Sequence, residues 1–146
     1  MARIVSGMGT SHVPGVGAAI DNGKTNEPYW KPLFAGFGPL RAWHRKHVPD
    51  VNIIVFYDHG TYFSLDKYST FTLGVAENFK AADEGWGPRK VPDVQGHPDL
   101  AWHILEQLIF EEFDMAVAGS LDVCLLYTSD AADEGLGVDL GGRRII

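Results

Sequence analysis

Six histidines give this chain of 146 residues most of its capacity to bind a metal ion, and two of them share a context. His12 and His59 each follow a segment that the sequence predicts to be a strand, and α/β folds gather ligand-binding groups beyond the carboxyl ends of strands. Two neighbouring imidazoles and one carboxylate form the facial triad that binds Fe(II) and leaves positions open. Asp58, beside His59, could orient an imidazole through a hydrogen bond or simply cap its loop. Buried histidines at strand ends are also common without a metal, so both interpretations stay open.

The other four histidines fit structural roles. His44 and His47 lie in a basic stretch at the end of a predicted helix, where cationic side chains interact favourably with the helix dipole. We expect both to be solvated surface residues. His97 lies at the start of another predicted helix and His103 in its middle, so we expect capping or surface packing for them.

The composition is that of an acidic globular protein. The net charge of -7 disfavours nucleic-acid and anionic-membrane partners, because both bind concentrated basic patches. No apolar run is long enough to cross a bilayer, and the N-terminal residues lack the pattern of a signal peptide. Cys124 is the only cysteine, which leaves no disulfide framework or thiolate metal site and favours a cytoplasmic location. Any metal would be held by imidazole and carboxylate.

Alternating strand and helix signals predict an α/β fold, with a layered mixed β-sheet flanked by helices. Strands are expected at 2–6 and 51–57, and the β-branched and aromatic run 51–57 is typical of a strand buried on both faces. Loops are expected at 10–15 and 81–94, where glycine and proline recur. Residues 62–75 fit either a strand or irregular structure.

Two helices and a further strand complete the predicted elements. A short helix is expected over 39–47. It should end before Val48-Pro49, because the residue before a proline avoids the helical region. A longer helix is expected to start at His97-Pro98-Asp99, with proline in the first turn. Its core-facing stripe is Leu100, Ile104, Leu108 and Ile109. Residues 114–118 then predict the next buried strand, which completes a strand–helix–strand unit.

Several long stretches, in order over about 120 residues, resemble the class III extradiol dioxygenases and in particular the beta (catalytic) subunit of protocatechuate 4,5-dioxygenase. The matching stretches are Thr10-Ser11-His12-Val13-Pro14, Asp58-His59, 81–88 (AADEGWGP), 91–94 (VPDV), 96–104 (GHPDLAWHI) and 112–115 (EFDM). The related gallate dioxygenases belong to the same class. Where relatives often have asparagine before the Asp-His pair, this chain has Tyr57, which leaves the substrate preference within the class open.

The resemblance implies that His12 and His59 are metal ligands of a non-haem Fe(2+) that binds a small aromatic diol and O2. Extradiol cleavage of a protocatechuate- or gallate-like acid is the implied reaction, and a non-catalytic metal- or aromatic-binding member of the fold is the alternative. A small alpha subunit and an oligomer are partners that the resemblance allows. The acid/base histidine and the glutamate ligand of the family have no counterpart up to Val123, so this chain is expected to be inactive.

The last part of the sequence, 124–146, does not look encoded by the same gene as the residues before it. Residues 124–134 are what one reading frame of a common transposase sequencing adapter encodes, and residues 138–146 match the flow-cell primer beyond it. Gly135 to Gly137 lie where the variable barcode would fall. We therefore expect 1–123 to be the N-terminal portion of the catalytic domain and 124–146 to be a non-native tail.

Overall fold

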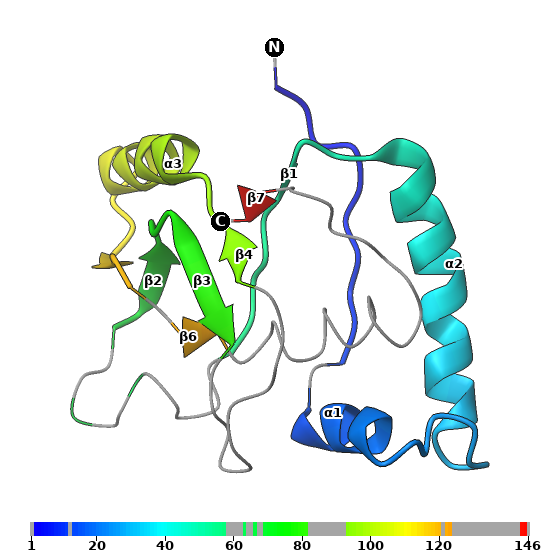
Figure 1. Ribbon diagram of the computed structural model, residues 1–146. Helices are drawn as coiled ribbons and strands as arrows, with labels where there is room; N and C mark the ends of the chain where they lie inside the picture. Colours follow the sequence, from blue (N-terminus) through cyan, green and yellow to red (C-terminus); the bar gives the residue numbers. More distant parts are fainter. Residues whose placement is uncertain are drawn as a thin grey trace. The chain divides into compact units, whose positions relative to one another are not determined.

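The computed structural model describes residues 2–11, 13–57, 63, 66, 69–81, 93–120, 122–123 and 144–145. These residues fall into two compact units, one before Asp50 and one from Asp50 onward, and each unit is considered by itself. Helices and short strands, in parallel and antiparallel pairs, confirm the predicted α/β fold class (Figure 1). None of the described helices combines the length and the apolar character needed to span a membrane.

The first unit is built on two helices, α1 (Pro14–Asp21) and α2 (Lys31–His47). Proline occupies the first turn of each, where the missing N–H costs no hydrogen bond. The core of this unit consists of Val16, Ala19 and Phe34. Around this core pack the partly buried Ile20, Trp30, Leu33 and Phe37.

The turn after α1 shows why the chain reverses there. Gly23 has a φ of +64°, the left-handed conformation that glycine adopts without a Cβ clash. Its N–H donates to the carbonyl of Ile20, and the N–H of Lys24 donates to the carbonyl of Ala19 at 2.7 Å. This pair of bonds is a Schellman motif, which satisfies carbonyl groups at the end of α1.

The start of α2 corrects a prediction. The helix begins at Lys31 rather than at Pro39, so Pro39 lies inside it. Pro32 in the first turn is the true start signal, and an interior proline costs a helix about 3 kcal/mol. Packing of Phe34 against Trp30 and Phe37, with ring centroids 6.3 and 5.9 Å apart, helps to offset that cost. The predicted end before Pro49 is confirmed.

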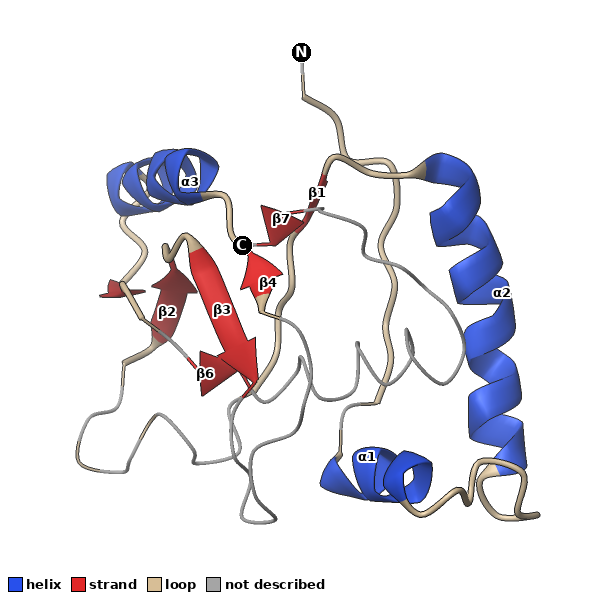
Figure 2. Cartoon of the chain, viewed as in Figure 1, coloured by secondary structure: helices blue, strands red, loops and turns tan. Residues whose placement is uncertain are grey.

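The second unit holds the strands. They are β1 (Val51–Asn52), β2 (Phe71–Gly74), β3 (Asn78–Ala81), β4 (Val94–Gln95), β5 (Met115–Ala118), β6 (Asp122–Val123) and β7 (Arg144–Ile145). β2 and β5 pair in parallel, with Phe71 opposite Met115, and β1 pairs in parallel with β7. β3 lies between antiparallel β4 and parallel β6. The ladders are short, and Figure 2 shows β2 next to α3.

Helix α3 (Pro98–Phe110) packs on the parallel β2–β5 pair, so the strand predicted at 114–118 is present as β5. This strand is not buried as predicted, since only Ala118 is fully buried and Val117 is 44% exposed. Val75 and Ala101 are buried between helix and strands. Leu73, Leu100, Ile104 and Val51 pack around them. The predicted stripe holds at Leu100, Ile104 and Leu108, but Ile109 is 52% exposed. Ala101 and Leu105, which are 1% and 2% exposed, are the core residues of α3 that the predicted stripe omitted.

Two predicted strands are wrong in whole or in part. Residues 2–6 form no strand, and Ile4 is 92% exposed. Of the run 51–57, only Val51 and Asn52 form a strand, and Val55 is 92% exposed rather than buried on both faces. Strand propensity becomes a strand only where a neighbour pairs with the backbone, and no strand ladder of the described residues includes 2–6 or 53–57.

The predicted loops fare differently. The expected loop 10–15 is shortened, because α1 already begins at Pro14. In the region 62–75, β2 confirms a strand at its end. Most of the predicted loop 81–94, namely 82–92, lies outside the described residues.

Candidate functional site

His12 lies outside the described residues, but both of its neighbours are described. Ser11 and Val13 are exposed, and Val13 is the N-cap of α1, with Pro14 as its first helical residue. The N–H of Val16 donates to the carbonyl of Val13 at 2.9 Å, which closes the first turn. In the sequence, His12 therefore directly precedes the N-cap residue of α1. The strand that we predicted before it, at 2–6, is absent.

Asp58 and His59 also lie outside the described residues, directly after the segment 53–57. That segment alternates: Ile53, Val55 and Tyr57 are 59%, 92% and 86% exposed, whereas the residues between them are half-buried. An alternation of period two is the geometry of an extended chain. The approach to His59 therefore has the side-chain arrangement of a strand without the ladder.

His12 and His59 belong to different units, and the prediction that they lie side by side stays a prediction. The same holds for Asp58 as a partner that orients an imidazole. Among the residues that the structure does describe, no group of three or more His, Cys, Asp or Glu side chains is placed to hold a metal ion.

Three of the four remaining histidines, His47, His97 and His103, occupy the ends and surface of helices, as predicted. The Nδ1 atom of His97 accepts a hydrogen bond from the N–H of Leu100 at 3.4 Å, which confirms the capping role. His103 is exposed on α3. His47 is exposed, and its ring stacks on Trp43 with centroids 4.2 Å apart. The ring Nδ1 of His47 also lies 2.8 Å from the Trp43 carbonyl.

His44 departs from the surface role that we expected for it. It lies in the last turn of α2 together with Arg45, Lys46 and His47, where positive charge complements the carbonyl end of the helix dipole. Unlike His47, however, it is half-buried.

A polar cluster that the sequence analysis did not single out lies at the start of β2 and β5. The Thr70 hydroxyl donates to a carboxylate oxygen of Asp114 at 2.7 Å, and the hydroxyls of Ser69 and Thr72 share a hydrogen bond. The first bond joins residues 44 positions apart and ties the beginnings of the two parallel strands together. In the sequence, the Ser69-Thr70 pair before β2 is the feature that could have indicated this polar cluster.

The chain matches a known protein family over most of its length. Residues 6–141 match the family of the catalytic LigB subunit of aromatic ring-opening dioxygenase. The matched range includes both stretches that contain the candidate ligands, around His12 and His59. Enzymes of this family are in general metal-dependent. Since the match spans nearly the whole sequence, the chain belongs to the LigB family of aromatic ring-opening dioxygenases.

Proposed function

We propose that the sequence carries the N-terminal part of an Fe(II)-dependent extradiol dioxygenase, related to the beta subunit of protocatechuate 4,5-dioxygenase. Its substrate would be a catechol-type aromatic acid, protocatechuate or a gallate-like acid. The observation that carries the proposal is the family match over 6–141, because it spans both histidine-containing stretches in order.

The donor chemistry of His12 and His59 fits a ferrous ion. Neutral imidazole suits Fe(II), and two histidines with one carboxylate form a facial triad that leaves positions free for other ligands. Bound there, the metal would supply coordination positions for the diol and for O2. The chain would contribute the two imidazoles, with Asp58 accepting a hydrogen bond that fixes the orientation of one ring. The carboxylate ligand and the acid/base histidine would come from residues after Val123.

We further propose that the natural protein continues after Val123 and that 124–146 is translated adapter. The order and spacing of two fixed adapter stretches support this proposal. The exposed side chains of Ile53, Val55 and Tyr57, on one face of an extended segment, also fit a domain that lacks the layer covering that face. The family match itself runs on to residue 141 and marks no boundary at Val123.

Sequencing the locus from source DNA tests the second proposal. We expect the genomic frame to depart from the present sequence after Val123 and to encode a histidine and a glutamate in the added region. An uninterrupted genomic frame that encodes 124–146 would refute it.

Oxygen uptake tests the first proposal. We expect the product of the complete gene, loaded with Fe(II), to consume O2 with protocatechuate or gallate, and the 146-residue chain to consume none. Substrate binding by the complete product without O2 uptake would instead identify a non-catalytic binding protein. Turnover by the 146-residue chain alone would show that His12 and His59 need no later ligand.

A further inference from the structure

The turn that ends α1 contains the one Asn-Gly pair of the sequence, Asn22-Gly23. In such a pair the backbone nitrogen of the glycine can attack the side-chain amide carbon of the asparagine, because glycine has no Cβ to hinder the approach. A bond forms between the Gly23 nitrogen and Cγ of Asn22, the Cγ–Nδ2 bond breaks, and ammonia leaves with the proton of the Gly23 amide. Water then opens the five-membered imide, which leaves aspartate or isoaspartate at position 22.

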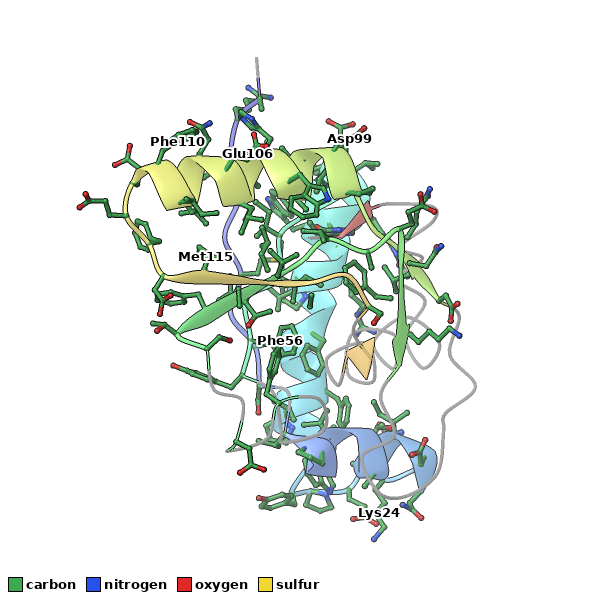
Figure 3. All side chains as sticks on the ribbon, turned by 90° about the vertical axis from the view of Figure 1, so that its left-hand side faces the viewer. Lys24, Phe56, Asp99, Glu106, Phe110 and Met115 are labelled. Atoms are coloured by element: carbon green, nitrogen blue, oxygen red, sulfur yellow. The ribbon has the colours of Figure 1, made fainter. Side chains whose placement is uncertain are left out.

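Water reaches this pair directly. Asn22, Gly23 and Lys24 are all exposed, and the side chain of Lys24 points away from α1 just past the helix end (Figure 3). Each of the other three asparagines in the sequence is followed by a residue that has a side chain. Asn26, followed by Glu27, is exposed in the same unit and is therefore a matched comparison for the effect of the glycine.

The folded turn holds the reacting atoms apart. Asn22 has a ψ of 9°, which nearly eclipses the Gly23 nitrogen with the Asn22 backbone nitrogen, whereas closing the imide ring requires it to eclipse Cβ. The N–H of Gly23 donates to the carbonyl of Ile20 at 2.9 Å. Nδ2 of Asn22 donates to the carbonyl of Ala18 at 2.7 Å. Carbonyl groups of α1 thus hold both the attacking nitrogen and the leaving nitrogen.

We propose that Asn22 is a site of spontaneous deamidation and that the C-terminal cap of α1 sets its rate. The reaction proceeds from the open form of the turn, in which the hydrogen bonds to Ala18 and Ile20 are broken and the backbone of Asn22 rotates freely. Helix ends open more readily than buried helix interiors. The folded chain therefore deamidates more slowly than the unfolded chain, by the fraction of time that the turn is open.

The product cannot rebuild the cap that delays its formation. A carboxylate at position 22 has no proton to donate to the Ala18 carbonyl. It also adds negative charge beside Asp21 at the carbonyl end of the helix dipole, and α1 has no basic residue in its last turn to offset that charge. Isoaspartate, in addition, lengthens the main chain by one carbon and moves the Gly23 N–H away from the Ile20 carbonyl. Deamidation therefore leaves the end of α1 permanently weakened.

Timed incubation of the 146-residue chain, followed by peptide mapping with mass spectrometry, tests the proposal. We expect Asn22 to convert at a rate that rises with pH, because the attack requires a deprotonated amide. Asn26 should convert at least roughly tenfold more slowly. In guanidinium chloride, which opens the turn, Asn22 should convert at least roughly tenfold faster than in the folded chain, the factor that an opening free energy of about 1.4 kcal/mol gives.

Each failure of these expectations overturns a stated part of the proposal. Equal rates at Asn22 and Asn26, or conversion of Asn22 only in guanidinium chloride, would show that the folded chain has no deamidation site at this turn. Equal rates for Asn22 with and without guanidinium chloride would show that the cap does not control the reaction.

Matched valine variants test the control by α1. Val16 is 1% exposed in the core that holds α1, so Val16→Ala should raise the rate at Asn22 roughly threefold or more. Val55→Ala, at a position that is 92% exposed in the other unit, should leave the rate unchanged. A Val16→Ala chain that unfolds outright should convert at the rate seen in guanidinium chloride. Equal rates in the two variants would refute control by the helix.

A product mimic tests the damage to the cap. Asn22→Asp should lower the melting temperature of the chain, whereas Asn26→Asp, which makes the same change of charge at an exposed position in the same unit, should lower it less. Equal changes in the two variants would show that the product leaves the end of α1 intact.

Discussion

The β2–α3–β5 region and the segments 2–11 and 53–57 all contain β-branched apolar residues, but only the first buries apolar side chains fully. In β2–α3–β5, each strand has a parallel partner and a helix covers the pair, so Ala101 and Leu105 are buried. In 2–11 and 53–57, the side chains of Ile4 and Val55 are each 92% exposed. Hydrophobic sequence therefore specifies a buried strand only together with a neighbour to pair with.

Gly96→Ala should break the packed region and have the largest effect. A Cβ at Gly96 would clash with the backbone oxygen of Ala76 and lie 2.9 Å from Cε2 of Phe79, while the Gly96 N–H bonds to the carbonyl of Glu77. The Ala76 carbonyl and the Gly96 backbone cannot move apart without breaking the hydrogen bond between Gly96 and Glu77. We therefore expect a loss of about 3 kcal/mol or more in the free energy of unfolding. Urea unfolding followed by circular dichroism measures it.

Gly119→Ala is the matched control, because no atom lies within 4 Å of its added Cβ. We expect it to change the free energy of unfolding by less than about 1 kcal/mol. Equal losses for the two variants would mean that the close approach at Gly96 does not exist in solution.

Leu105→Ala and Val55→Ala compare the two kinds of region directly. Leu105 is 2% exposed, so its truncation leaves a cavity under α3 and should cost about 2 to 5 kcal/mol. Val55 is 92% exposed, so Val55→Ala should lower the free energy of unfolding by less than about 0.5 kcal/mol. The same urea titration checks both. A large loss for Val55→Ala would show that 53–57 is packed in solution and would remove the contrast.

Glu112→Gly should give the smallest effect, and it should be stabilising. Glu112 has a φ of +64° in the Schellman motif that ends α3, the position that Gly23 occupies after α1. Glycine relieves the Cβ strain of that conformation, so we expect a gain of about 0.5 to 1 kcal/mol. Glu111→Gly, at a φ of -85°, should bring no gain. The melting temperatures of the two variants distinguish them. An equal change of melting temperature in both would contradict backbone strain at Glu112.

Elements with local signals could be predicted from the sequence. The start of α3 follows from Pro98 in its first turn, and the end of α2 from the proline after Val48. The predicted start of α2 was wrong, because Pro32 and Pro39 are equally good helix-start signals when each is considered alone. Only packing of Phe34 against α1 distinguishes them.

The candidate site could be predicted only as residue types. Histidines at 12 and 59 suggest metal binding by their chemistry, but their predicted approach depended on strands at 2–6 and 51–57. Pairing of those segments is a long-range property, and of their residues only Val51 and Asn52 belong to a strand ladder in the described part of the chain. The carboxylate ligand could not be assigned from the sequence, because the glutamate ligand of the family has no counterpart up to Val123.

The iron content of two histidine variants tests the central claim, that His12 and His59 are the ligands of this dioxygenase. The measurement uses the product of the complete gene, reconstituted with Fe(II) and desalted. We predict that His12→Ala and His59→Ala each lower Fe(II) affinity by at least about 100-fold and abolish O2 uptake, while His103→Ala, at an exposed position on α3, retains both. Wild-type iron content and rate in either ligand variant would contradict the assignment.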